Sequence, residues 1–191
     1  MATRQEETFL ILREAVTQLF EKTFGETPKI LPQAEAGVET NTQLIASLGL
    51  SGSLDASVAV GLSQAGACTL VSKMLGSEIK EFSQDAVDGA GEIVNMLAGV
   101  IKSKFAERGC VFILSLPSVI TATMSLSIRQ LVKSEGNVLS AEIFGIRLDV
   151  FFFYARFGVG QVTLSEVIAK GMPSQDPAEA LRKLLAQKPS I

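Results

Sequence analysis

The spacing of hydrophobic residues predicts a helix followed by a pair of strands at the beginning of the chain. Hydrophobic side chains recur at every third or fourth position over residues 8–24, which is typical of an amphipathic helix, and Gly25 follows as a stop signal. Residues 54–62 alternate strictly between hydrophobic and small or polar side chains, which predicts a strand with one buried face. Ser51 and Gly52 are expected to form the turn that joins this strand to another over residues 44–50.

Two more helices are expected next. Ser63 is a suitable N-cap for a short helix that ends at Gly76. Ser83 begins a longer helix that runs to about residue 108, with Gly109 at its end. On a helical wheel, the hydrophobic residues of this longer helix gather on one side: Ala90, Ile93, Val94, Leu97, Val100, Ile101 and Phe105.

The remainder of the chain is expected to be rich in strands. Strands are predicted over residues 111–116, 124–132, 138–144 and 146–154, with the last two forming a hairpin about Gly145. The order of one helix, two strands, two helices and about four strands favours an α+β fold. We expect a mostly antiparallel sheet of about six strands, with the helices packed on one face and an extra helix near the C-terminus.

The last predicted strand, residues 146–154, has unusual hydrophobic residues on its second face. Phe151 and Phe153 share that face with Arg147 and Asp149, so something is expected to cover the two aromatic rings. The cover is either a partner subunit or the C-terminal tail, where residues 178–185 carry a hydrophobic helical stripe. The strand has neither proline nor inward lysine to protect an exposed edge, which favours edge-to-edge pairing with a second copy. We divide the chain into a domain over residues 1–157 and a C-terminal extension with a short helix over residues 158–191.

The composition excludes several kinds of partner and catalytic site. The 191 residues carry 17 basic and 20 acidic side chains, a net charge of −3, which argues against nucleic acid as a partner. The chain has no histidine, so His-ligated zinc and nucleophiles paired with histidine are excluded. Cys68 and Cys110 lie in hydrophobic surroundings and are expected to be buried, reduced thiols. No secretion leader and no apolar run long enough for a bilayer are present, so we expect a cytoplasmic protein without a membrane partner.

The polar face of the long helix carries the strongest functional signal. Opposite the hydrophobic side lie Asp85, Asp88, Glu92, Asn95, Gly99 and Ser103. Glu92 and Asn95 are three positions apart and therefore project from the same patch. Gly89, Gly91 and Gly99 lie within or beside this face, although each glycine costs a helix about 1 kcal/mol relative to alanine. The pattern predicts a face that another molecule covers; alternatively, these are ordinary surface residues and the glycines pack the helix against the sheet.

Residues 88–99 (DGAGEIVNMLAG) resemble the signature of the CheC/CheX/FliY phosphatases of bacterial chemotaxis. In that family an acidic residue or serine precedes the glutamate by four positions, asparagine follows it by three, and a proline comes some twenty residues later. Asp88, Glu92, Asn95 and Pro117 match these positions. The resemblance covers residues 8–154, and the order of elements is similar to that of CheX. Glu14 is followed by Thr17, so the second E-x-x-N motif of CheC-like members is absent, as it is in CheX.

The resemblance implies a phosphatase that removes the aspartyl phosphate of a CheY-like response regulator. Asn95 would orient the attacking water and Glu92 would dock on the lysine of the receiver domain. Asp88 and Gly99 would belong to the docking face: Gly99 would give clearance, and Asp88 either assists docking or is simply an acidic residue favoured near a helix start by the dipole. No cofactor or metal of its own is implied, because the receiver brings Mg²⁺, and a homodimer is expected. The alternative is a non-catalytic module of the same fold, as in flagellar switch components, that binds a receiver without hydrolysing it.

Overall fold

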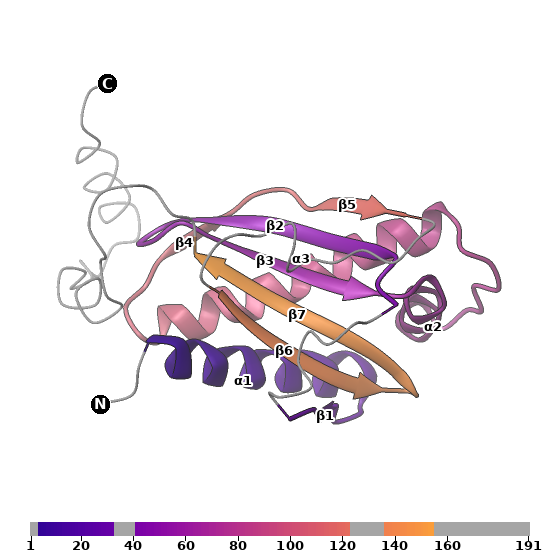
Figure 1. Cartoon of the computed structure of the whole chain (residues 1–191), viewed down its shortest axis with the longest axis horizontal. Coiled ribbons are helices and arrows are strands. Elements are labelled where there is room, and N and C mark those ends of the chain that lie inside the picture. The colour runs from indigo at the N-terminus through magenta and orange to yellow at the C-terminus, as the bar shows by residue number, and fades with distance from the viewer. Residues whose placement is uncertain (1–3, 33–40, 123–135, 155–191) are drawn as a thin grey trace, which may run out of the picture.

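The computed structural model describes residues 4–32, 41–122 and 136–154, which form one antiparallel sheet with three helices on one face (Figure 1). This arrangement confirms the predicted α+β fold. In chain order the elements are α1 (Arg4–Phe24), β1 (Lys29–Ile30), β2 (Leu44–Gly52), β3 (Ala56–Leu62), α2 (Gln64–Leu75), α3 (Gln84–Ala106), β4 (Phe112–Leu114), β5 (Ser118–Thr121), β6 (Gly136–Ile143) and β7 (Ile146–Tyr154).

The described strands follow the order β1-β6-β7-β3-β2, and β4 and β5 share the outer edge of β2. β4 pairs with the end of β2, where Leu50 lies opposite Leu114, and β5 pairs with its beginning, where Leu44 lies opposite Thr121. Residues 115–117 connect these two short strands. The outer neighbour of β2 is therefore β5 along its first half and β4 along its second. β5 also contacts α3 (Figure 1).

Local signals placed several elements correctly. The side chain of Ser63 accepts a hydrogen bond from the Gly66 N–H at 3.0 Å and so caps α2, and Gly76 ends that helix in the left-handed conformation, with φ of 66°. The β2–β3 hairpin is confirmed, but Ser51 and Gly52 belong to β2, where they pair with Ile113 and Phe112 of β4, and residues 53–55 make the connection. The turn between β6 and β7 has positive φ at both Phe144 and Gly145, which is the twist that a two-residue hairpin requires.

The position of β7 corrects the expectation of an exposed edge. β7 pairs with β3 on one side and with β6 on the other, so it lies inside the sheet. Its backbone hydrogen-bonding groups are therefore satisfied on both sides and offer no edge to another chain. The edges of the described sheet are instead β1 and the β4/β5 pair.

Two short strands escaped prediction, and two predicted elements cannot be compared. β1 has two residues and β5 has four, which is too short for a hydrophobic alternation to stand out. The strand expected over residues 124–132 and the helix expected in the C-terminal extension lie outside the described residues.

The main core fills the space between the sheet and the helices. The ring of Phe105 on α3 stacks on that of Phe152, with centroids 5.4 Å apart, and meets the ring of Phe112 edge-on at 5.3 Å. A second, smaller hydrophobic cluster lies on the opposite face of the sheet, where Phe151 is only 3% exposed and stacks on Phe153. This confirms that the two rings of β7 share the face away from the helices.

Candidate functional site

α3 presents the polar face that the sequence predicted. Its hydrophobic side packs into the core, where Ile93, Leu97 and Ile101 are at most 1% exposed. On the opposite side Asp88 and Glu92 are exposed and Asn95 is half-buried. The helical wheel therefore separated the buried and the accessible sides of this helix correctly.

Glu92 and Asn95 lie together on this face. The Nδ2 of Asn95 donates to Oε2 of Glu92 at 3.5 Å, which is long for a hydrogen bond. A contact of this length constrains the two side chains only weakly. Both groups can therefore turn towards a bound molecule without losing a strong interaction.

Asp88 lies one turn before Glu92 and is engaged within its own helix. The Nε2 of Gln84 donates to Oδ1 of Asp88 at 2.7 Å. An acidic side chain near the N-terminal end of a helix is also stabilised by the helix dipole. The surroundings of Asp88 are therefore explained by α3 itself.

The three glycines of α3 differ in their surroundings: two lie against packed neighbours, as in the alternative interpretation, and one does not. A Cβ on Gly89 would lie 2.6 Å from Cγ2 of Val71, so Gly89 allows α2 and α3 to pack closely. A Cβ on Gly91 would lie 3.5 Å from Cγ2 of Val119 on β5. Only Gly99 has open space where a side chain would be, as a docking surface requires.

Pro117 lies beside the predicted pair. Its Cγ is 4.0 Å from the position that a Cβ on Gly91 would take. Gly91 is adjacent to Glu92 in the sequence and one helical turn before Asn95. The fold thus brings the proline of the signature, from another segment, close to the stretch of α3 that carries Glu92 and Asn95.

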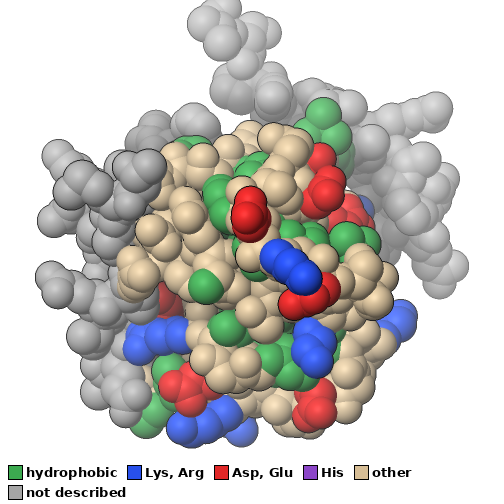
Figure 2. Space-filling model, turned by 90° about the vertical axis from the view of Figure 1, so that its right-hand side faces the viewer, with side chains coloured by type: hydrophobic (Ala, Val, Ile, Leu, Met, Phe, Trp, Pro, Cys, Tyr) green, Lys and Arg blue, Asp and Glu red, His purple; other side chains and the backbone are tan. Residues whose placement is uncertain are grey.

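The end of the molecule at which α2 lies and α3 begins has a mixed surface. Figure 2 shows this end, where acidic and basic side chains are interspersed with hydrophobic ones. Neither sign of charge forms a continuous patch in this view. Such a surface suits a partner that is recognised by individual contacts, rather than one attracted by a broad electrostatic field.

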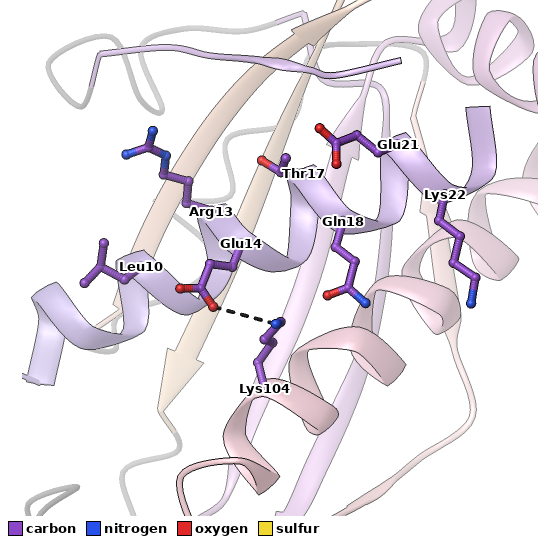
Figure 3. A pocket seen from close by; sticks show the side chains of 8 residues that line it. All are labelled: Leu10, Arg13, Glu14, Thr17, Gln18, Glu21, Lys22 and Lys104. Atoms are coloured by element: carbon purple, nitrogen blue, oxygen red, sulfur yellow. Dashed lines mark ion pairs between the residues drawn. The ribbon is translucent and has the colours of Figure 1, made fainter. Parts of the chain in front are cut away.

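A groove lies between α1 and the C-terminal part of α3 (Figure 3). Its lining residues are Leu10, Arg13, Glu14, Thr17, Gln18, Glu21, Lys22 and Lys104. The carboxylate of Glu14 lies 3.9 Å from Nζ of Lys104 and 3.9 Å from the guanidinium of Arg108. Thr17 occupies the place where a second E-x-x-N motif would put its asparagine. Glu14 is therefore engaged by Lys104 near the end of α3 and by Arg108 just after it, and the asparagine of a second E-x-x-N motif is absent.

The two cysteines and the described acidic side chains do not form a second candidate site. Burial raises the pKa of the Cys110 thiol, which is fully buried, and that of the Cys68 thiol. Within the described part of the chain, no three acidic or cysteine side chains gather in a way that could hold a metal ion. None of the described helices combines the length and hydrophobicity needed to span a bilayer.

Solved structures of chemotaxis proteins share this fold. The CheX protein of Desulfovibrio desulfuricans is 23% identical, with a TM-score of 0.63 over 78% of this chain and 99% of that one. The CheX chain of a CheX–CheY–BeF₃–Mg²⁺ complex from Borrelia burgdorferi is 17% identical, with a TM-score of 0.65 over 78% and 98%. Thermotoga maritima FliY is 14% identical, with a TM-score of 0.55 over 94% and 96%.

The family follows from the sequence itself. The family model for chemotaxis phosphatase CheX matches residues 44–141, which is just over half of the chain and includes all of α3. The chain therefore belongs to the CheX family of chemotaxis proteins. No curated protein sequence matches it significantly.

Proposed function

We propose that this protein hydrolyses the aspartyl phosphate of a CheY-like receiver domain in chemotaxis signalling, in the cytoplasm. The observation that carries the proposal is the juxtaposition of Glu92 and Asn95 on the accessible face of α3, in a chain of the CheX family. The Borrelia burgdorferi complex, in which a CheX chain of the same fold is bound to CheY with BeF₃ and Mg²⁺, supports this partner.

The chemistry needs little from the phosphatase beyond the placement of water. An aspartyl phosphate is already activated, and the receiver supplies the Mg²⁺ and the lysine that neutralise the phosphoryl charge. A water oxygen attacks phosphorus as the bond from phosphorus to the aspartyl oxygen breaks, giving inorganic phosphate and a free carboxylate. The carboxamide of Asn95 both donates and accepts hydrogen bonds and stays neutral at any working pH, so it is suited to orient that water.

Glu92 is suited to a different task. Its carboxylate is exposed and accepts only the long bond from Asn95 among the hydrogen bonds that the described residues show. We assign it to an ion pair with the receiver lysine, which would fix the position of the receiver over Asn95. Gly99 would let the receiver surface approach α3 closely, whereas Asp88 is assigned no direct part.

The experiment measures hydrolysis and binding separately. Phosphate release is followed with a phosphorylated CheY-type receiver from the same organism, and affinity is measured with that receiver activated by beryllofluoride. Asn95→Ala is expected to slow phosphate release by about 100-fold or more, because the in-line water loses its positioning group. Binding to the beryllofluoride form should remain close to that of the wild type.

The control and the contrary outcomes are well defined. Asn41→Ala removes an exposed asparagine that precedes β2 and should leave hydrolysis unchanged. A fully active Asn95→Ala protein would contradict the catalytic assignment. A wild-type protein that binds the activated receiver without releasing phosphate would favour the alternative of a non-catalytic binding module.

We also propose that two copies associate through the edge formed by β4 and β5. Ile113 and Ile120 are 52% and 55% exposed there, and their partners on β2 are Ser51 and Ile45. Hydrophobic side chains on a strand that pairs on one side only are typical of an edge that another chain covers. The sequence predicted β7 as the edge that pairs with a second copy. β7 cannot do so, because it lies between β6 and β3.

A further inference from the structure

Leu116 is the most exposed large hydrophobic residue in the described part of the chain. It is 88% exposed and lies in the connection between β4 and β5. A single exposed leucine needs no explanation by itself. Leu116 differs from such a residue because its backbone is fixed and because it lies next to the candidate site.

The backbone on the N-terminal side of Leu116 is held firmly. Ser115 N–H donates to the Gly49 carbonyl at 2.9 Å, and Gly49 N–H donates to Ser115 Oγ at 2.9 Å. The Ser115 hydroxyl in turn donates to the carbonyl of Leu116 at 3.0 Å. Two hydrogen bonds thus tie this connection to β2, and a third fixes its own backbone at Leu116. An exposed side chain on a fixed backbone loses less conformational freedom when a partner covers it.

The C-terminal side of Leu116 leads directly to the predicted site. The next residue, Pro117, has a restricted φ, and its Cγ would lie 4.0 Å from a Cβ placed on Gly91 of α3. Cγ2 of Val119 on β5 would lie 3.5 Å from the same position. The backbone around Leu116 is therefore fixed by β2 on one side and by packing against α3, close to Glu92 and Asn95, on the other.

We infer that Leu116 is a hydrophobic anchor for the receiver domain when its phosphoryl group lies at Asn95. The inference rests on the proposed function, because it takes the receiver as the occupant of this surface. A folded domain that reaches both Glu92 and Asn95 must also extend over the adjoining surface of the molecule. Leu116 immediately precedes Pro117 and its side chain is 88% exposed, so burial under that domain would remove it from water.

The test substitutes Leu116 and measures KM and kcat separately. Leu116→Ser is expected to raise the Kd for the beryllofluoride-activated receiver, and the KM for the phosphorylated receiver, by about tenfold, since the burial of a leucine side chain is lost. The kcat at saturation should be unchanged, because Asn95 and Glu92 are untouched. Leu116→Met retains a hydrophobic side chain and should bind almost as well as the wild type.

A matched control separates this effect from a general loss of surface hydrophobicity. Leu10 is 48% exposed on α1, in the groove where Glu14 pairs with Lys104. Lys104 is twelve residues beyond Glu92, which corresponds to about 18 Å along α3. Leu10→Ser should therefore leave Kd, KM and kcat unchanged.

Three results would overturn the inference. An unchanged Kd and KM in Leu116→Ser, together with an inactive Asn95→Ala, would remove the anchor and leave the phosphatase assignment standing. A lower kcat without a change in KM would also contradict a docking role. A change in molar mass by light scattering, with receiver affinity unchanged, would assign Leu116 to a contact between copies. A wild-type protein that neither binds nor dephosphorylates the receiver would instead contradict the proposed function itself.

Discussion

The carboxylate of Glu92 stands at the centre of the polar face of α3, between Asp88 and Asn95 in the sequence. If it pairs with a receiver lysine, Glu92→Gln should weaken receiver binding and Glu92→Lys should weaken it further, because a like charge then faces that lysine. The expected order of Kd, measured with the beryllofluoride-activated receiver, is wild type, Gln, then Lys.

The control for this series reverses a charge away from the site. Glu26 is exposed just after α1, and Glu26→Lys makes the same change in net charge as Glu92→Lys. It should therefore leave the Kd close to the wild-type value at moderate salt, where distant surface charges are screened. If Glu92→Lys dephosphorylates the receiver as fast as the wild type, Glu92 has no docking role.

Two glycines of α3 provide a matched pair of substitutions at the level of the helix. Gly89→Ala would place a methyl group against the buried Val71 of α2, so the two helices must separate or shift. We expect a loss of about 1–3 kcal/mol in the free energy of unfolding. Gly99→Ala meets only open space and removes a flexible residue from a helix interior, which should stabilise the protein by about 1 kcal/mol.

The same pair also tests the docking face. Urea unfolding gives the two stability changes, and titration with the activated receiver gives the affinities. Gly99→Ala is expected to bind the receiver more weakly despite its higher stability, because its methyl group occupies the clearance. A Gly99→Ala protein that is more stable and binds normally would show that Gly99 has no part in docking.

Sequence reasoning succeeded where a signal is local. Ser63 and Gly76 correctly marked the two ends of α2, because capping depends on residues within one turn of the helix end. The wheel of α3 placed Glu92 and Asn95 on its accessible side because the helical period alone separates the two sides. These local rules placed the pair of residues on one accessible face, whereas the family signature came from the resemblance of residues 88–99 to a known motif.

Sequence reasoning failed where the answer depends on distant segments. Gly89 and Gly99 are indistinguishable by helical propensity, and only the position of α2 makes one of them indispensable for packing. β7 was taken for an edge because its neighbours, β3 and β6, are set by pairing across the sheet rather than by its own residues. The exposed position of Leu116 depends on hydrogen bonds between Ser115 and Gly49, 66 residues apart.

At the scale of the whole molecule, the outer edge that β4 and β5 form in the described sheet predicts self-association. Light scattering of the full chain should give about twice the 20.3 kDa of one copy. Ile113→Glu should shift the protein towards the monomer, because a charge would then be buried without a partner at the contact. Leu75→Glu, at a side chain that is 58% exposed at the end of α2, should leave the dimer intact. A full-length protein that is a monomer at every concentration would exclude the dimer.

The pairing of β3 with β7 has a consequence for how the protein is made. Val58 lies opposite Phe152, 94 residues later in the chain, and at ordinary rates of synthesis β7 leaves the ribosome roughly 5–20 s after β3. During that interval the hydrophobic β2–β3 hairpin has one side without its strand. α1 also lacks one of its partners during this interval, because Thr8 in its second turn hydrogen-bonds to the hydroxyl of Tyr154 at the end of β7. The nascent chain is therefore most open to aggregation, and most in need of a chaperone, until nearly all of the sheet has been translated.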